Sequence, residues 1–498
     1  MEAQNSHGQA SDRILQWMRG VPWSDPEQAE LLVKRMQILT ESSDHAVAFY
    51  QILSQQLSRA FDADLSLARI LQFFEASDDH EFWLGLFSKN SDALSALQQL
   101  MGMSETIANR IIADPETFSW IIETSGEPKS REELITDLSE QLEEVDQLNR
   151  ASNLLRQFYV RHTTRVAYAE FITGLSPEKV GRYLSAIADS MIEVGLQFVM
   201  KRLIARRGEP QRPDGTVAEV AVIGLGNLGG NEMSYNSPLK LVFLYDSIDN
   251  HNVWHRDFYS TLVDELVGLL RGDPTRTSGL DVDLREGPRS EVGIHICSFR
   301  EAIRIYETAG RTSQRLDFVK SRIVAGSRDL GNALLARLEP WIYQQFMSRV
   351  ELDETRTIRR KLEKRVEQTS HLSHDLTDTP GGKHDLELTI QFLQLLHGGS
   401  LPEVRKSNTY EAVGALQRSG CLTHQESMLF SESYARLGRL QNQIALMFDR
   451  SGKVLPENAS DQCRLAWHLG IKKSDADEAD LDRFQNLLLD TFENIVHP

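Results

Sequence analysis

The sequence contains little cysteine and no long apolar run. Its three cysteines, Cys297, Cys421 and Cys463, are widely separated among 498 residues, which argues against a disulfide framework or a zinc site and favours a reducing compartment. No uninterrupted apolar run reaches the length of about 18 residues that a membrane helix needs, and the N-terminal region has no signal-peptide core. These absences predict a cytoplasmic protein without a membrane partner.

Positive charge is also scarce. Lys and Arg number 54 against 72 Asp and Glu, so the formal net charge is −18. A protein that binds a nucleic-acid backbone needs a positive field to attract the phosphates. We therefore expect no nucleic-acid partner. The length is sufficient for several domains with buried cores.

A glycine-rich stretch stands out against this background. Val220–Ile223 and Leu239–Tyr245 are short apolar runs that predict two strands. Glycines between a strand and a helix allow a phosphate to approach the backbone closely, and the N–H groups exposed there favour an anion. The candidate glycines of this turn are Gly224, Gly226, Gly229 and Gly230.

Two common glycine motifs do not fit this stretch. A Rossmann unit needs a longer helix and a parallel strand about thirty residues further on, but here the next strand begins only about ten residues later. A P-loop needs Gly-Lys followed by Ser or Thr, which is absent. A polymerase-β-like nucleotidyltransferase fits better, because in that fold a GG or GS turn holds the triphosphate and a D-x-D on the next strand holds the metals.

The stretch resembles a known family signature. Residues 224–237 read G-L-G-N-L-G-G-N-E-M-S-Y-N-S, which is similar to G-x-G-K-L-G-G-x-E-L-x-x-x-S-D-x-D-L of the glutamine synthetase adenylyltransferase family. Residues 282–285 match the start of its V-D-L-R-L-R-P motif. Residues 311–326 resemble its R-x-W-E-R-x-A-x-x-K-A-R-x-V-A-G motif, and residues 381–399 resemble its G-G-I-R-D-I-E-F-x-x-Q-x-x-Q-L motif. The resemblance covers roughly residues 31–471, one half of the family's usual two-half architecture.

The resemblance implies a fold and an activity. It implies an α+β, mostly helical protein with a central polymerase-β-like nucleotidyltransferase domain. Family members transfer AMP from ATP to glutamine synthetase, or remove it by phosphorolysis, with ATP and Mg²⁺ as cofactors and a PII-type signalling protein as a further partner. The nucleotide-binding residues that it implies are Gly224, Gly226, Gly229, Gly230, Ser237, Arg285, Lys320 and Arg322.

The expected metal site is degenerate. In the family, S-D-x-D places two carboxylates on one face of a strand, where they can hold Mg²⁺. Here Pro238 and Lys240 occupy those positions, so Asp283 is the sole retained carboxylate for a catalytic or metal-binding role. Asn227 replaces the lysine of the first motif. A pair between Lys240 and Asp283 would put one fixed positive charge in place of the metal.

The chain is expected to divide into domains. We predict a frayed N-terminus over residues 1–26 and a helical domain over 27–207. A linker rich in Gly and Pro precedes a nucleotidyltransferase-like domain over 217–343. A C-terminal helical bundle over 351–498 completes the chain.

Several local features carry their own expectations. Ser104 is a candidate N-cap. Arg161 and Arg165 are expected on a solvated helix face. Residues 311–324 predict either such a basic helix face or a triphosphate site. The first helix of the helical domain over residues 27–207 is expected to bury Leu31, Leu32, Met36 and Leu39.

Two functions stay open at this point. One is an adenylyltransferase acting on glutamine synthetase with a degenerate metal site. The other is a catalytically inactive pseudoenzyme that binds a nucleotide or a protein partner as a regulatory module. Addition and removal of AMP both remain possible, as does a companion half on a separate chain.

Overall fold

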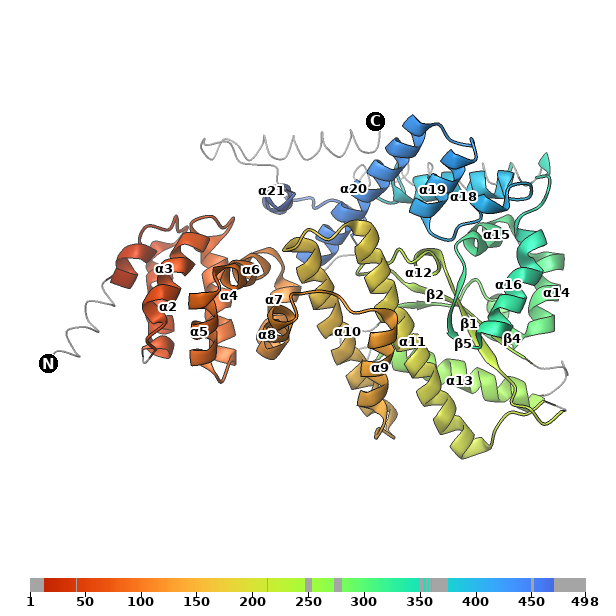
Figure 1. Ribbon diagram of the computed structural model, residues 1–498, viewed down its shortest axis with the longest axis horizontal. Coiled ribbons are helices and arrows are strands. Elements are labelled where there is room, and N and C mark those ends of the chain that lie inside the picture. Colours follow the sequence, from red (N-terminus) through yellow and green to blue (C-terminus); the bar gives the residue numbers. More distant parts are fainter. Residues whose placement is uncertain are drawn as a thin grey trace.

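The computed structural model describes residues 13–41, 43–212, 214–246, 253–272, 280–349, 375–448 and 452–469, and residues 351, 353, 354, 357 and 360. Helices dominate it, and one small mixed sheet lies among them (Figure 1). The predicted fold class, α+β and mostly helical, is therefore confirmed. None of the described helices is long and apolar enough to cross a membrane.

Short helices form one end of the molecule, red to orange in Figure 1. Packing begins before residue 27, the predicted start of the helical domain, because Ile14, Met18 and Val21 are already buried. Leu31 is 61% exposed, so its expected place in the core is wrong. These helices are α2 (Pro26–Thr40), α3 (Ala46–Leu57), α4 (Ala63–Ala76), α5 (His80–Lys89), α6 (Ser91–Met103), α7 (Glu105–Ala113) and α8 (Pro115–Glu123).

One short helix and two long ones lie between these and the sheet, coloured orange to gold in Figure 1. They are α9 (Arg131–Leu142), α10 (Leu148–Phe171) and α11 (Pro177–Arg207). The prediction that Arg165 lies on a solvated face of α10 is wrong, because this residue is buried. Its guanidinium carbon lies 3.2 Å from the ring centroid of Trp120, and its Nη2 donates to Thr124 Oγ1 at 2.6 Å. A delocalised cation stacks well on an indole, so this buried charge is accommodated by the ring.

Five strands form one sheet in the order β3-β2-β1-β5, with β4 also paired to β2. β1 is antiparallel to β2 and β5, whereas β3 and β4 are parallel to β2. The strands are β1 (Val220–Leu225), β2 (Leu239–Tyr245), β3 (Val282–Asp283), β4 (Ile296–Ser298) and β5 (Arg322–Gly326). The two strands that the sequence predicts around the glycines are both present.

β5 replaces part of an expected helix. Helix α15 (Thr312–Val319) ends early, and the residues from Arg322 onward pair with β1. Ile323 and Val324 are β-branched, which favours a strand, and Val324 is fully buried in the core. The tertiary contact with β1 therefore decides this segment against the helix that its charge pattern suggests.

The two faces of the sheet contribute to different cores. Because side chains alternate along a strand, Val222 and Phe243 join a core shared with the N-terminal helices, whereas Ile223 and Leu244 join a second one. The first core is continuous from α2 to β2, so the predicted boundary between residues 207 and 217 stays a prediction. The helices that pack around the sheet include α13 (Val253–Arg271), α14 (Phe299–Ala309) and α16 (Arg328–Ile342).

The C-terminal helices are cyan to blue in Figure 1; α18, α19 and α20 lie around the turn between β1 and β2, whereas α21 lies towards the N-terminal helices. They are α18 (Lys383–His397), α19 (Thr409–Arg418), α20 (His424–Phe448) and α21 (Ala459–His468). α18 packs on α15, and α20 reaches back to α7 and α11. The predicted bundle extends to residue 498, but its residues beyond 469 lie outside those described.

Ser104 is the predicted N-cap of α7, and its capping role is confirmed. Its Oγ accepts from the backbone N–H of Ile107 at 3.1 Å and also donates to the carbonyl of Leu446 in α20. The residue is fully buried. One hydroxyl therefore caps a helix and joins the N-terminal helices to the C-terminal ones.

Replacing this hydroxyl is expected to destabilise the protein more than an ordinary cap would. Ser104→Ala removes the cap and leaves the Leu446 carbonyl without its partner, so we expect a loss of about 2–3 kcal/mol in urea denaturation. The matched control is Ser130→Ala, which removes an exposed capping box with Glu133 from α9 and should cost about 1 kcal/mol. Equal losses would contradict the tie to α20.

Candidate functional site

The glycine turn, residues 226–232, joins β1 to β2 and contains the short helix α12 (Gly226–Gly229). Gly226 has a φ of +57°, which glycine adopts without steric cost. A Cβ on Gly229 would lie only 1.8 Å from the carbonyl oxygen of Lys320, so the chain after α15 passes directly against the turn. Close packing inside the fold therefore requires glycine at position 229, whether or not the turn binds a phosphate.

Ser237 is buried at the end of the loop that follows the turn. Its Oγ accepts from the backbone N–H of Ser234 at 2.9 Å and from Asn227 Nδ2 at 3.2 Å. Asn227, which replaces the family lysine, is thus a hydrogen-bond donor within the loop. The predicted nucleotide-binding role of Ser237 stays a prediction.

Lys240 does not pair with Asp283 as the sequence suggests. The two residues are register partners on β2 and β3, but Lys240 Nζ bonds to Asp317 Oδ1 of α15 at 3.0 Å. Asp317 stands where the family motif has alanine, so both members of the pair depart from the family pattern. Burial opposes the charge of Lys240, but Asp317 outweighs it and raises the pKa of the ammonium group.

The Lys240 side chain also lies along the glycine turn. Its Cδ is 3.3 Å from the point that a Cβ on Gly226 would occupy. The aliphatic part of the side chain thus lies along the turn, and its ammonium group reaches Asp317 of α15.

Both carboxylate oxygens of Asp283 accept hydrogen bonds from Arg285, two residues further along the chain. Its Oδ1 accepts from the backbone N–H of Arg285 at 3.0 Å and from Arg285 Nε at 2.9 Å, and its Oδ2 accepts from Nη2 at 2.7 Å. These hydrogen bonds lower the pKa of Asp283. Arg285 is largely exposed, so water competes for this pair and it could open.

The residues present do not fit a divalent cation. Mg²⁺ requires several oxygen ligands in octahedral geometry, usually including carboxylates. Of the family's three carboxylate positions, Pro238 offers no ligand and Lys240 carries a positive charge. Among the described residues, no group of three His, Cys, Asp or Glu side chains is arranged to hold a metal. Glu286 adds a further acid near Lys240, and burial together with Asp317 raises its pKa.

Lys320 and Arg322 are both engaged with buried carboxylates. Arg322 donates to both oxygens of Asp189 in α11, at 2.5 and 2.8 Å, and its Nε donates to the carbonyl of Leu228 in the turn at 3.1 Å. Lys320 is 2% exposed and contacts two glutamates. Both predicted triphosphate ligands therefore hold the turn within the fold.

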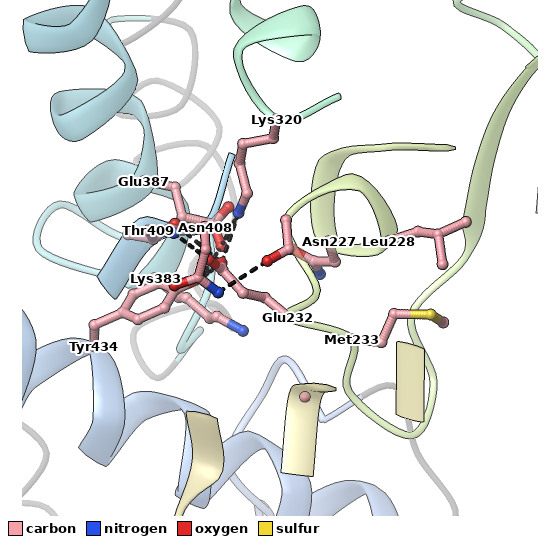
Figure 2. Close-up of polar contacts among 12 residues, drawn as sticks. Asn227, Leu228, Glu232, Met233, Lys320, Lys383, Glu387, Asn408, Thr409 and Tyr434 are labelled. Atoms are coloured by element: carbon pink, nitrogen blue, oxygen red, sulfur yellow. Dashed lines mark hydrogen bonds and ion pairs between the residues drawn. The ribbon is translucent and has the colours of Figure 1, made fainter. Parts of the chain in front are cut away.

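Figure 2 shows the buried charge cluster around Lys320, which comprises Glu232, Lys320, Lys383, Glu387 and Tyr434. Lys320 Nζ lies 2.8 Å from Glu232 Oε2 and 3.4 Å from Glu387 Oε1. The Tyr434 hydroxyl is 2.6 Å from Glu232 and 2.5 Å from Glu387. Burial would raise the pKa of Glu387, but Lys320 and Lys383 outweigh it and lower this pKa to about 2.

The cluster includes residues that the sequence analysis does not single out. Glu232 lies within the first family motif, so the motif itself could have identified it. Tyr434 has no such signal, and neither has Thr409, which bonds to Glu232, because each belongs to a distant helix and reaches the turn only in the folded chain. Asp317 could have been noticed as a new acid opposite a new lysine.

A cleft of about 1060 Å³ lies beside β3. Of the predicted site residues, Pro238, Asp283 and Arg285 line it. The glycine turn, Lys320 and Arg322 are not among its lining residues within the described part of the chain. The structure thus separates the predicted site into a cleft around Asp283 and a packed turn around Lys320.

Glu170 of α10 holds the loop on the other side of the turn. Its two oxygens accept from the Tyr235 hydroxyl at 2.8 Å and from Asn442 Nδ2 of α20 at 3.0 Å. Burial raises the pKa of Glu170 to about 7, against the opposing effect of both hydrogen bonds and of Arg439. A carboxyl group that joins α10, the loop and α20 is thus partly protonated near neutral pH.

Comparisons with known proteins agree with the motifs. Residues 94–337 match the family model for glutamate-ammonia ligase adenylyltransferase, and residues 345–497 match the one for GlnD PII-uridylyltransferase. Among curated relatives, the "Bifunctional glutamine synthetase adenylyltransferase/adenylyl-removing enzyme" of Shewanella oneidensis is 26% identical over 428 residues. The enzyme of the same name from Xanthomonas axonopodis pv. citri is 29% identical over 322 residues.

The alignments cover less than half the length of these relatives. The alignment with the Shewanella protein covers 82% of this chain but 44% of the relative, and that with the Xanthomonas protein covers 64% and 34%. The similarity therefore concerns one part of a longer enzyme.

Gly229→Ala is expected to disrupt the packing of the turn. The new Cβ would overlap the carbonyl oxygens of Lys320 and Gly224, so the backbone must shift, and we expect a loss of at least about 3 kcal/mol in thermal or urea denaturation. Gly268→Ala in α13 is the matched control. No atom lies within 4 Å of its new Cβ, and alanine favours a helix, so stability should stay equal or rise by up to about 1 kcal/mol. Similar effects of both changes would contradict this account.

Glu170→Gln is expected to remove a pH dependence of stability. In the folded state the pKa of Glu170 is about 7, whereas in the unfolded state it should be about 4.3. The stability that protonated Glu170 contributes is therefore fully present below about pH 4 and is lost as the pH rises through 7. Urea denaturation between pH 5 and 8 should show the wild type losing roughly 2 kcal/mol relative to the variant. Glu140→Gln, on an exposed side of α9, is the control, and parallel curves for wild type and Glu170→Gln would argue against the assignment.

Proposed function

Since the chain belongs to the glutamine synthetase adenylyltransferase family, of which it represents about one half, we propose that it regulates glutamine synthetase as a binding partner without carrying out Mg²⁺-dependent adenylyl transfer. It is then a pseudoenzyme that keeps the nucleotidyltransferase architecture. Glutamine synthetase is the proposed partner because it appears in the names of the relatives. The match of residues 345–497 to a PII-uridylyltransferase model supports a PII-type protein as a second partner.

The ion pair between Lys240 and Asp317 is the observation that carries this proposal. It puts an ammonium group on the strand position where the family has a metal-binding carboxylate, and it adds an acid that neutralises this group. A divalent cation approaching Asp283 would meet the positive charge of Lys240 and would have to displace Arg285. Lys240 and Asp283 thus each have an oppositely charged partner within the chain, without an ion from solution.

A fixed ammonium group is a poor replacement for the metal in this chemistry. Transfer of AMP needs charge neutralisation at the phosphate oxygens while the nucleophile attacks in line. Lys240 has its charge directed at Asp317, and its stem lies against the glycine turn. ATP is the nucleotide that the family uses, and the retained glycine turn supports weak nucleotide binding as a further proposal.

The experiment measures transfer and metal binding in the same samples. We expect the wild type to sediment with purified glutamine synthetase, to transfer no label from ATP, and to bind no Mn²⁺ by electron paramagnetic resonance. A triple variant, Pro238→Asp with Lys240→Asp and Asp317→Ala, restores the family's charge pattern. We expect it to gain Mn²⁺ binding and, with it, measurable transfer.

The matched control is Lys201→Asp on the exposed side of α11, which makes the same net charge change of about −2 away from the site. It should gain neither property. Labelling of glutamine synthetase by the wild type that Asp283→Ala abolishes would overturn the proposal and establish the alternative, a transferase with a degenerate metal site. Failure to sediment with glutamine synthetase would overturn the proposed partner.

A further inference from the structure

The N-terminus of α19 lies directly on the glycine turn. Asn408 Nδ2 donates to the carbonyl of Gly230 at 2.9 Å. A Cβ on Gly230 would lie 3.0 Å from the carbonyl oxygen of Ser407, so the two backbones are in close contact. Thr409 donates to Glu232 both from its backbone N–H and from its Oγ1, the latter at 3.0 Å. The N-terminus of α19 therefore contacts the carboxylate of Glu232, at the end of the helix where the dipole favours negative charge.

Glu232 collects donors from three separate segments. Besides Thr409 of α19, it accepts from Lys320, between α15 and β5, at 2.8 Å and from Tyr434 of α20 at 2.6 Å. Glu232 is 6% exposed, and all of its partners are buried. These segments lie 88, 177 and 202 residues away in the sequence, so only the complete fold brings them together.

Charge balance makes these contacts interdependent. Lys320 forms ion pairs with both Glu232 and Glu387, while burial lowers the pKa of the neighbouring Lys383, whose Nζ donates to Gln441 Oε1 at 3.2 Å. The Tyr434 hydroxyl has one hydrogen and lies within 2.6 Å of both carboxylates, so the two share it. Displacing Lys320 or Glu232 leaves a buried charge without an ion-pair partner, and displacing the Tyr434 hydroxyl removes a donor that both carboxylates share; each is costly in a water-poor interior. The contacts therefore form or break largely together.

We infer that Glu232 is a positioning residue that couples the glycine turn to α19 and α20, so that the turn and these helices change conformation together. A partner that shifts α19 or α20 would then alter the turn, and a ligand at the turn would alter the surface of these helices. The turn's contact with α11, through Arg322 and Asp189, anchors it on another side and does not involve Glu232. This inference holds whether or not the chain transfers AMP.

Hydrogen–deuterium exchange of the full-length protein, followed by mass spectrometry, tests the coupling. Amides of the turn are hydrogen-bonded in the fold, for example from Glu232 to the Asn227 carbonyl at 2.8 Å, so their opening is measurable. Tyr434→Phe keeps the ring but removes the hydroxyl. We expect about tenfold faster exchange in residues 226–232 and in the first turn of α19, with no change in α4 or α6.

The decisive comparison is between single and double variants. Glu232→Gln should also speed exchange in the turn and in the first turn of α19. Adding Tyr434→Phe to it should cause little further change at the turn, because the interaction between Glu232 and Tyr434 is already lost. The matched control is Glu411→Gln. Glu411 is an exposed residue of α19 that pairs with Arg182 at 3.0 Å, so its replacement should leave exchange in the turn unchanged.

Two results would overturn the inference. One is an effect of Tyr434→Phe confined to α20. The other is strictly additive effects of the two changes at the turn, which is what independent structural roles would produce. If Glu232→Gln does not fold, Tyr434→Phe with Asn408→Ala as a second single variant still decides, because each must reach the turn from outside it.

Discussion

A charge removed from water needs an opposite charge or several hydrogen bonds, and this requirement organises the region around the glycine turn. Glu232 and Lys320 form one buried pair, and Arg322 with Asp189 forms another on the side of α11. Each pair joins the turn, or the segment packed against it, to an element far away in the sequence. Contacts with the surrounding helices therefore fix the conformation of the turn together with its own glycines. Close contact between Gly229 and the Lys320 carbonyl adds a steric condition to the electrostatic one.

The same requirement explains how the chain can keep the family fold while it lacks the family's metal-binding carboxylates. A strand position that held an acid now holds Lys240, and α15 supplies Asp317 at a position where the family has a small apolar residue. The two side chains form an ion pair of 3.0 Å. Asp283, the retained acid, has its oxygens occupied by Arg285. The pair Lys240–Asp317 thus consists of two residues that both depart from the family motifs and that contact each other in the fold.

The arrangement of the helices gives the turn contacts on several sides. α10 and α20 meet at Glu170, which holds the loop after the turn through Tyr235, while Ser104 ties α7 to α20. The core is continuous from the N-terminal helices to one face of the sheet. Movement of α20 would thus reach both the turn and the N-terminal helices. Through these connections, a contact made by one part of the chain can affect another part.

The sequence by itself determined the fold class, the strands β1 and β2, the cap at Ser104 and the family, because each depends on a local pattern or a contiguous motif. The tertiary structure alone decided which charges meet. Lys240 pairs with Asp317, 77 residues further along the chain, and not with its register partner Asp283. It also decided that Arg165 is buried against Trp120 and that residues after Arg322 form a strand. Periodicity and motifs describe neighbours in the sequence, whereas the partner of a buried charge depends on which distant helix packs across it.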